Sequence, residues 1–252
     1  MHEFLGSLHM LENTAILIFI AKGVAFTVII SVLSVLASIV FGSVLALIRN
    51  YFTSPEQRIL RWITIVYIEI FRNTPLLFWI FISLVFVPVP DAFSHQLFGL
   101  SSVETKVLFK TVIALTLFES ATIAEIIRGG LNAVPNGQFE AGHSQGFTMV
   151  QTMIHIILPQ AYRHVVPTLL SQVITIIKDT SFLANVATIE LMARIKKILS
   201  NANMYNGIGT INVADVFVLF GVAALIYFVI NYALSLTVRY LQAREKRQPS
   251  QV

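Results

Sequence analysis

Two charged side chains lie deep inside long apolar stretches of this 252-residue sequence. Arg72 follows Arg61 by eleven residues and Glu119 follows Lys110 by nine, about 16 Å and about 14 Å along a helix. If these stretches cross a membrane, both charges approach the middle of a hydrocarbon core about 30 Å thick. A charge there costs about 2.5 to 3.5 kcal/mol, so it normally faces a partner, a cavity or a pathway. Opposite charges at this depth can bind a polar ligand or hold two helices together.

The structural alternative is a buried salt bridge of Arg72 with Glu119 or with Glu69. A separate pair is formed by Glu125 and Arg128, which are three residues apart and share a helix face. This pair lies close to the end of its apolar stretch, too near the membrane surface for a site in the middle. We therefore predict that Glu125 and Arg128 form a structural ion pair.

Motifs for catalysis are absent from the sequence. No glycine is followed by lysine, which excludes a P-loop for ATP. His143, His155 and His164 are separated by twelve and nine residues, a spacing that fits no ordinary metal site, and the chain has no cysteine. We expect no enzymatic activity, no metal and no cofactor in this chain.

The composition is that of a membrane protein. Hydrophobic residues make up 56% of the chain, charged residues only 12%, and the mean hydropathy is +0.78. A net charge of +4 could indicate nucleic acid binding in a soluble protein. Here the basic residues lie mostly in short loops and in the tail, so the charge indicates membrane topology and no nucleic acid partner is expected.

Five apolar stretches predict an all-α membrane protein with five transmembrane helices in a single domain, residues 1–252. Each is about long enough to cross the bilayer. Prolines and charges interrupt the second, third and fourth. The stretches cover residues 23–48, 62–87, 106–130, 151–178 and 216–238.

Basic residues after the first stretch set the predicted orientation. Arg49, Arg58 and Arg61 occupy the short linker that follows it, and by the positive-inside rule this linker faces the cytoplasm. The N-terminus is then outside and the basic C-terminal tail inside. A further amphipathic helix is predicted at residues 189–199, with Ile195 on its apolar face and Glu190 and Arg194 pointing away.

A polar, glycine-marked loop separates the third and fourth stretches. After the turn Pro135-Asn136-Gly137, a short helix over residues 138–146 can end at Gly146 in a left-handed conformation. The loop then reads Glu140-Ala141-Gly142, three residues, Gly146, nine residues, Ile156, one residue, Leu158-Pro159.

This spacing resembles the EAA loop of permease subunits of bacterial ABC importers. The one departure is Gly142, where the pattern has a second alanine. The runs FRNTPLL at 71–77, AEIIRGGL at 124–131 and KDTS at 178–181 look like stretches of the polar amino acid permeases in that superfamily. The resemblance covers about residues 15–245, with the loop at about 135–159.

The resemblance implies a type I ABC importer permease in the bacterial plasma membrane, with a cytoplasmic coupling helix. The implied partners are ATPase subunits that bind ATP and Mg, a second permease subunit, identical or homologous, and an extracytoplasmic amino-acid-binding protein. The implied substrate is a polar amino acid, with glutamine or glutamate as the narrower expectation.

Two sets of site residues are predicted, the first from the depth and charge of residues within the apolar stretches and the second from the family resemblance. The predicted substrate site combines the charges within the membrane with polar neighbours: Arg72, Asn73, Thr74, Glu119, Ser120, Thr122, Lys178, Asp179, Thr180 and Ser181. The predicted ATPase contacts are Gln138, Glu140, Ala141, Gly142, Gly146 and Phe147. An autonomous channel or a secondary transporter is the alternative, but it leaves the EAA-like loop unexplained.

Overall fold

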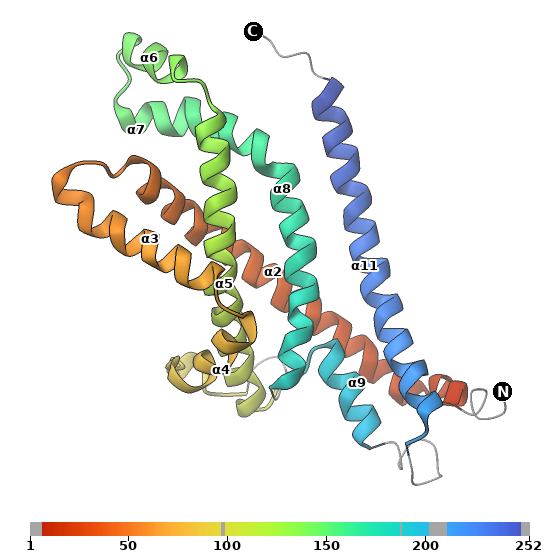
Figure 1. Ribbon diagram of the computed structural model, residues 1–252. Coiled ribbons are helices and arrows are strands. Elements are labelled where there is room, and N and C mark those ends of the chain that lie inside the picture. Colours follow the sequence, from red (N-terminus) through yellow and green to blue (C-terminus); the bar gives the residue numbers. More distant parts are fainter. Residues whose placement is uncertain (1–6, 97–98, 187, 202–210, 248–252) are drawn as a thin grey trace. The chain divides into compact units, whose positions relative to one another are not determined.

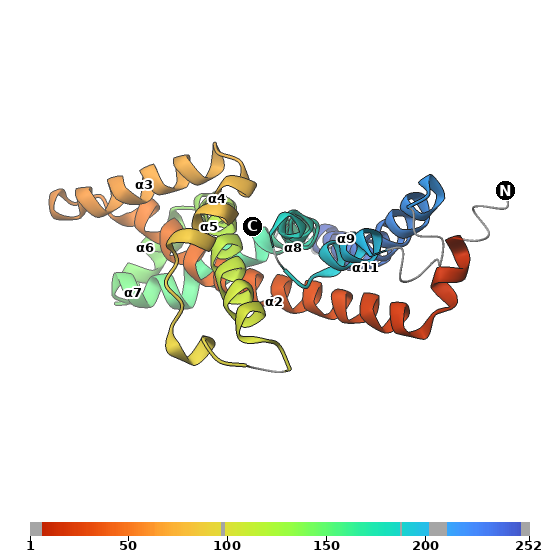
Figure 2. The ribbon, with the colours of Figure 1, turned by 90° about the horizontal axis from the view of Figure 1, so that it is seen from below.

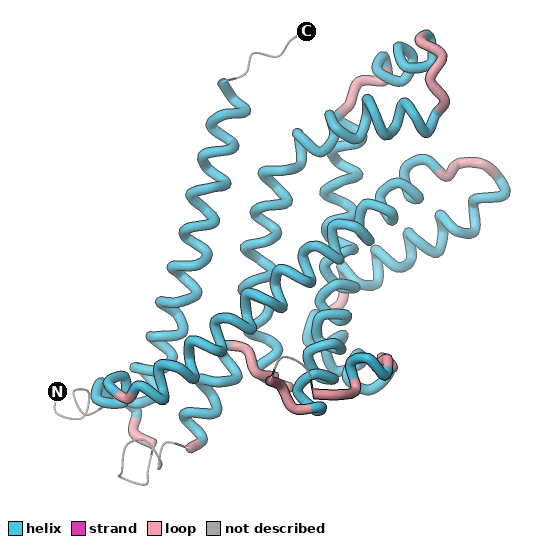
Figure 3. The backbone as a smooth tube through the Cα atoms, turned by 180° about the vertical axis from the view of Figure 1, so that it is seen from behind, coloured by secondary structure: helices cyan, strands magenta, loops and turns pink. Residues whose placement is uncertain are grey.

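The computed structural model describes residues 7–96, 99–186, 188–201 and 211–247. Within these ranges the regular structure is entirely helical (Figure 3). The longer helices alternate with single helical turns at His9–Glu12, Pro55–Gln57, Asp91–Phe93 and Thr180–Asn185. The main helices are α2 (Thr14–Tyr51), α3 (Arg58–Arg72), α4 (Leu76–Phe86), α5 (Ser102–Ala133), α6 (Gly137–Ser144), α7 (Met149–Thr152), α8 (Leu158–Asp179), α9 (Leu191–Ser200) and α11 (Val213–Arg247) (Figure 1).

Among the helices that the structure describes, three are long and apolar enough to cross a membrane by length and composition: α2, α5 and α11. They contain the predicted first, third and fifth stretches. A fourth span exists if α3 and α4 are counted together, although the two are bent by 114° at their junction. The fourth predicted stretch is divided among α7, a π-helical turn at Met153–Ile157 and α8.

The second predicted stretch, residues 62–87, is broken at Pro75, one of the prolines expected to interrupt it. α3 ends at Arg72, and α4 begins only at Leu76, directly after Pro75. Proline donates no backbone hydrogen bond and restricts the residue before it to extended conformations, so the helix ladder stops here. The side chains of Asn73 and Thr74 turn back to the carbonyls of Glu69 and Ile70 at 2.7 Å each, which satisfies carbonyls at the open end of α3.

The chain divides into two compact units, which we describe separately. Unit 1 comprises Met1–Leu33, Leu77–Ala114 and Ile174–Leu236; unit 2 comprises Ser34–Leu76, Leu115–Val173 and Thr237–Val252. The helices α2, α5, α8 and α11 each continue from one unit into the other. A single domain over the whole chain stays a prediction.

The core of unit 1 forms where α9 packs between the first turns of α2 and of α11 (Figure 2). Apolar side chains from these three helices and from the helical turn His9–Glu12 are buried together: Met10, Ile16, Ile20, Leu191, Ile195, Ile198, Leu219 and Ala223. The predicted amphipathic helix at 189–199 is therefore present, and Ile195 lies on its buried face as expected.

Glu190 corrects one detail of that prediction. Its side chain does not point away but is fully buried, and it caps the start of α9. Its carboxylate accepts the backbone N–H of Met192 at 2.8 Å and of Ala193 at 2.6 Å, and the hydroxyl of Tyr227 at 3.2 Å. Burial, the largest influence, raises the pKa of Glu190 to about 7, against the lowering effect of these hydrogen bonds.

Unit 2 contains the second half of α5 together with α3, α6, α7 and most of α8. Small residues let its helices approach closely. A Cβ atom at Gly42 of α2 would lie 2.9 Å from the carbonyl oxygen of Ser120 in α5. Tyr67 of α3 donates to the carbonyl of Leu117 at 2.6 Å, which ties α3 to the same side of α5. The charged residues of α2, α3 and α5 are thereby brought together.

Candidate functional site

A compact helical hairpin carries the residues of the EAA-like loop. α6 spans Gly137–Ser144, close to the predicted 138–146, and α7 folds back against it (Figure 1). Gly146 has φ of +81°, the left-handed conformation predicted for it. The amide of Gly146 bonds the carbonyl of His143 at 2.9 Å, and that of Phe147 bonds the carbonyl of Gly142 at 3.1 Å. These two bonds are the Schellman ending of a helix, so Gly146 fixes where α6 stops.

The start of α7 is held by a capping box that the sequence reasoning missed. Thr148 Oγ1 accepts the amide of Gln151 at 3.3 Å, while Gln151 Oε1 accepts the amide of Thr148 at 2.9 Å. A threonine followed three residues later by glutamine is the sequence signal for this arrangement. Together the Schellman ending and the capping box define both sides of the turn between α6 and α7.

Gly142 faces its own chain. Gly142 is one of the predicted ATPase contacts, but it is buried, and a Cβ atom there would lie 2.7 Å from Cγ2 and Oγ1 of Thr152 in α7. The glycine is needed because a β-branched residue of α7 occupies the space. Glu140 and Ala141 are exposed on the other side of α6, where a partner could contact them.

Further contacts join the hairpin to its surroundings in unit 2. Gln160 Nε2 of α8 donates to Gln138 Oε1 at 3.1 Å. The ring of Phe139 lies 6.0 Å from that of Tyr51 at the end of α2, and the ring of Phe147 lies 6.4 Å from that of His155. Of the predicted coupling residues, Gln138 and Phe147 are thus partly engaged within the chain.

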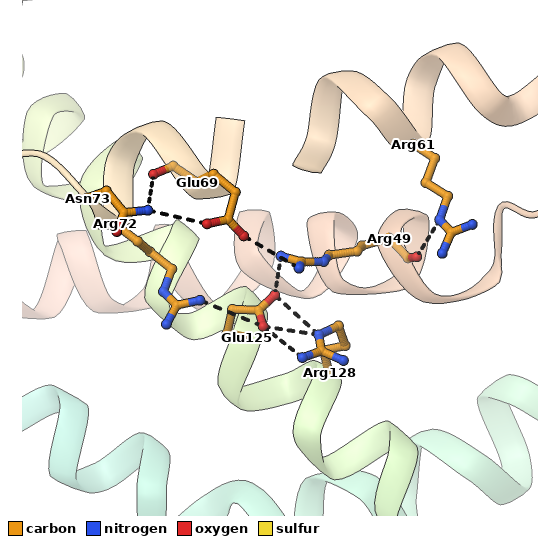
Figure 4. A network of polar contacts seen from close by, with 7 residues as sticks. All are labelled: Arg49, Arg61, Glu69, Arg72, Asn73, Glu125 and Arg128. Atoms are coloured by element: carbon orange, nitrogen blue, oxygen red, sulfur yellow. Dashed lines mark hydrogen bonds and ion pairs between the residues drawn. The ribbon is translucent and has the colours of Figure 1, made fainter. Parts of the chain in front are cut away.

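Glu125 is the centre of a second cluster, drawn in Figure 4. Its carboxylate faces three guanidinium groups: Arg49 at 2.6 Å, Arg128 at 2.9 Å and Arg72 at 3.8 Å. Arg49 of α2 also lies 3.6 Å from Glu69 of α3, and its carbonyl accepts Nε of Arg61 at 3.1 Å. The cluster therefore links α2, α3 and α5 through one carboxylate that is 15% exposed.

The predicted ion pair of Glu125 and Arg128 is present, but it is one part of this larger cluster. The same contacts revise the predicted depth of Arg72. We placed Arg72 in the middle of the membrane and Glu125 near its surface, yet the two lie side by side. The charged ends of these two side chains therefore lie at the same depth.

Glu119 lies in a different polar cluster. It is six residues before Glu125 on α5, about 9 Å along the helix. It is buried, and its Oε2 accepts Nε2 of Gln172 from α8 at 2.7 Å. Arg72 thus contacts Glu125 and Glu119 contacts Gln172, and a joint grip of one amino acid by Arg72 and Glu119 stays a prediction.

The remaining residues of the predicted substrate set are distributed over both units. Ser120 is buried and shares a hydrogen bond of 2.9 Å with Tyr67, while Thr122 of α5 is half-buried. The run from Lys178 to Ser181 belongs to unit 1, at the end of α8 and the turn after it. There Lys178 is exposed and the hydroxyl of Thr180 donates to the carbonyl of Ile177 at 2.7 Å.

Known proteins resemble this chain over nearly its whole length. The family described as the binding-protein-dependent transport system inner membrane component matches residues 38–247. A probable glutamine ABC transporter permease protein, GlnP of Bacillus subtilis (strain 168), is 35% identical over 229 residues, which cover 91% of this chain and 94% of the relative. The glutamate/aspartate import permease protein GltK of Escherichia coli O157:H7 is 33% identical over 230 residues, 90% of this chain and 93% of the relative.

Solved structures agree with these relatives. A crystal structure of an amino acid ABC transporter with histidines superposes with a TM-score of 0.69 at 26% identity, covering 94% of this chain and 97% of the other. The MetNI methionine ABC transporter in an inward-facing conformation gives a TM-score of 0.62 at 21% identity, over 91% and 99% of the two chains, which supports the fold alone.

The fold and these matches define a class, the permease subunits of type I ABC importers. Within it, the chain belongs to the family of binding-protein-dependent transport system inner membrane components. Membership implies that a binding protein, an ATPase and a second permease subunit act with this chain. The predicted family and the predicted transport function are confirmed. The alternative hypothesis, an autonomous channel or a secondary transporter, has no support from these matches.

Proposed function

We propose that this permease moves a polar amino acid from an extracytoplasmic binding protein to the cytoplasm, driven by ATP hydrolysis in a separate subunit. The hairpin formed by α6 and α7 is the observation that supports coupling to the ATPase. Glu140 and Ala141 are exposed on this hairpin. Its conformation is held by the packing of Gly142, the cap at Thr148 and the positive φ of Gly146. A short helix held in this way can transmit a movement of the ATPase to α5 and α8.

Replacing Gly146 tests the coupling role. A Cβ atom at φ of +81° is strained by about 1 to 2 kcal/mol, so Gly146→Ala should distort the end of α6. Gly137→Ala is the matched control, because Gly137 has open space around its Cβ position and no positive φ. In the assembled importer we expect Gly146→Ala to lower substrate-stimulated ATP hydrolysis and uptake several-fold, and Gly137→Ala to leave both unchanged. Normal coupling in Gly146→Ala would remove α6 from this role.

Five spans complete the proposed topology: α2, the broken pair α3 and α4, α5, α8 and α11. The N-terminus lies outside and the C-terminus inside the bacterial plasma membrane. Support comes from Arg49, Arg58 and Arg61 in the linker after α2. In this arrangement the linker between α5 and α8, which contains α6, faces the cytoplasm, where an ATPase would meet it.

Glutamine or glutamate is the proposed substrate, by analogy with relatives whose names state these amino acids. An L-cystine transport system permease protein, TcyB of Bacillus subtilis (strain 168), is 34% identical, so sulfur-containing amino acids belong in the comparison. Uptake of labelled L-glutamine into proteoliposomes containing the complete importer, with L-glutamate, L-cystine and L-histidine as competitors, would test the assignment. Absence of L-glutamine uptake would overturn the glutamine assignment, and competition by none of the three would exclude those amino acids.

Arg72 remains a candidate for contact with the substrate's carboxylate. Its side chain is 42% exposed, and its distance of 3.8 Å from Glu125 leaves the guanidinium able to form closer contacts. In the same assay Arg72→Gln should raise the half-saturation concentration if Arg72 contacts substrate. An unchanged half-saturation in a normally assembled complex would leave Arg72 with a structural role only.

A further inference from the structure

A cavity lined by charged residues lies in unit 1, beside α9 and outside the Glu125 cluster and the α6–α7 hairpin. Its volume is about 250 Å³. Its walls come from α2, the first turn of α5, the segment before α9 and α9 itself. The lining residues are Phe19, Glu104, Thr188, Ile189, Ala193, Arg194 and Lys197.

Arg194 is fixed in the wall of this cavity. Its Nε donates to the carbonyl of Ile189 at 2.8 Å, its Nη1 donates to the carbonyl of Phe19 at 3.3 Å, and its Cζ lies 4.3 Å from the centre of the Phe19 ring. Gly23 makes room for this side chain, since a Cβ atom there would lie 2.8 Å from Arg194 Cδ. Two of the five N–H donors of the guanidinium are used in these bonds, so the others can bind an anionic group.

Glu104 and Lys197 contribute charges of both signs to the same cavity. Glu104 Oε2 accepts the amide and the hydroxyl of Ser101 at 2.9 Å and 2.8 Å, which fixes the carboxylate at the start of α5. The Lys197 side chain is exposed, and in the described part of the chain its ammonium forms no hydrogen bond or ion pair. Within that part, Glu104 also forms no ion pair with either cation. In the described part of the chain the opposite charges thus line one cavity without a direct salt bridge, although they are close enough to attract one another.

The cavity belongs to the end of α5 that is remote from α6. Glu104 and Ala133 are separated by 29 residues of one helix, about 44 Å. That length exceeds the hydrocarbon core of about 30 Å, so the two ends of α5 lie on opposite sides of a membrane that it crosses. With α6 on the cytoplasmic side, Glu104 faces the extracytoplasmic side.

We propose that this cavity binds a free α-amino acid on the extracytoplasmic side of the permease. The carboxylate of the ligand contacts Arg194 and Lys197, and its ammonium contacts Glu104. The inference rests on the proposed function for its substrate class and its side of the membrane. The site would hold the amino acid released by the binding protein before it enters the pathway.

Size and chemistry favour this ligand over others. A volume of about 250 Å³ is below the range of about 300 to 1,000 Å³ for drug-sized ligands, which suits a small molecule. A simple anion such as phosphate would leave Glu104 facing a like charge. Phe19 and Ile189 supply an apolar surface for the carbon chain of an amino acid.

The test measures binding of labelled L-glutamine and L-glutamate to the assembled importer in nanodiscs, with no binding protein present. Lys197→Gln is the main variant, because the exposed ammonium makes no contact on which the fold depends. Glu104→Gln is the second variant, since glutamine still accepts from Ser101. Lys196→Gln is the matched control: it removes the same charge from the same helix, but Lys196 bonds Asn185 at 3.1 Å and does not line the cavity.

We expect affinity to fall about ten-fold or more in Lys197→Gln and Glu104→Gln, because each loses a charge-assisted contact, and to stay unchanged in Lys196→Gln. Absence of binding in the native importer, or equal binding in all variants, would overturn the site. So would a Lys197→Gln variant that binds the amino acids normally but associates less with the binding protein, since the cavity would then dock a protein side chain. Uptake by the native importer, measured in parallel, shows whether the proposed transport function itself fails.

Discussion

Gly142 and Thr152 show how a single pair can explain a departure from a family motif. The EAA pattern has alanine where this chain has Gly142, and here the space for a methyl group is taken by Thr152. The hydroxyl of Thr152 makes no hydrogen bond to any residue that the structure describes, so the threonine acts through its volume. The χ1 angle of a threonine in a helix is restricted, and both Cγ2 and Oγ1 of Thr152 lie 2.7 Å from the position of an added Cβ atom.

We therefore expect Gly142→Ala to destabilise the permease by about 1 to 3 kcal/mol, as for an overpacked core. The double variant Gly142→Ala/Thr152→Ala should recover most of that loss, because Thr152→Ala removes the colliding atoms. Thermal unfolding of the purified chain in detergent would measure both. Native stability of Gly142→Ala alone would show that α7 shifts more easily than this packing implies.

Glu190 predicts a pH dependence of stability. Its pKa is about 7 in the folded chain against an ordinary value of 4.5, so between these values the folded state binds more protons than the unfolded state. Stability is then greatest at low pH and falls as the pH rises from about 4.5 through 7. A shift of this size corresponds to about 3 kcal/mol between the two limits.

Glu190→Gln should remove most of this pH dependence, because glutamine does not ionise and can still accept one amide hydrogen bond. Tm measured at pH 5 and pH 8 in nanodiscs would show the difference. Glu56→Gln, at an exposed position, is the control and should keep the native profile. A native protein whose Tm does not fall between these pH values would contradict the buried position of the Glu190 charge.

At the scale of helices, Glu125 joins α2, α3 and α5. Its contacts with the three arginines differ in distance and exposure, so we expect their loss to lower the stability of the permease by different amounts. Glu125→Gln removes all three ion pairs, including that of Arg49, which is only 20% exposed. We expect the free energy of unfolding to fall by about 3 kcal/mol. Arg72→Gln should lower the free energy of unfolding by about 1 kcal/mol or less, because the Arg72 side chain is 42% exposed and lies 3.8 Å from the Glu125 carboxylate.

The same cluster changes the result expected from a charge swap. For an isolated pair, exchanging Glu125 and Arg128 would restore stability. In this structure the swap places an arginine beside Arg49 and Arg72, and like charges repel. The variant Glu125→Arg/Arg128→Glu should therefore be no more stable than Glu125→Gln by thermal unfolding. Full recovery would show that Arg49 and Arg72 contribute nothing to the site.

For the whole molecule, the five-span orientation can be tested directly because the chain has no cysteine. Single cysteines at Ser54 and Gln145 should react with a membrane-impermeant maleimide only after cells are permeabilised. Cysteines at Ser101 and Ser200 should react in intact cells; all four positions are exposed. Labelling of all four from one side, or of Ser54 from outside, would overturn the proposed topology.

The sequence by itself determined the helical membrane class, the long apolar helices α2, α5 and α11, and the loop that contains α6. These features follow from local properties: continuous apolar runs longer than a bilayer is thick, and a glycine at a position that requires positive φ. The matching family adds the importer class to this list. Each feature depends on residues near one another in the chain, which is why spacing alone was enough.

Only the tertiary structure decided which charges meet. Depth estimated along separate helices placed Arg72 with Glu119, whereas the packing of α3 on α5 places it beside Glu125, and Glu119 bonds Gln172 of α8. The sequence indicates a break at Pro75, but only the structure shows that α3 and α4 are bent by 114° there. Helix rotation, bending and register set these contacts, and they depend on side chains far apart in sequence. Burial of Glu190 beneath Tyr227 has the same origin, because polarity alone predicts an exposed carboxylate.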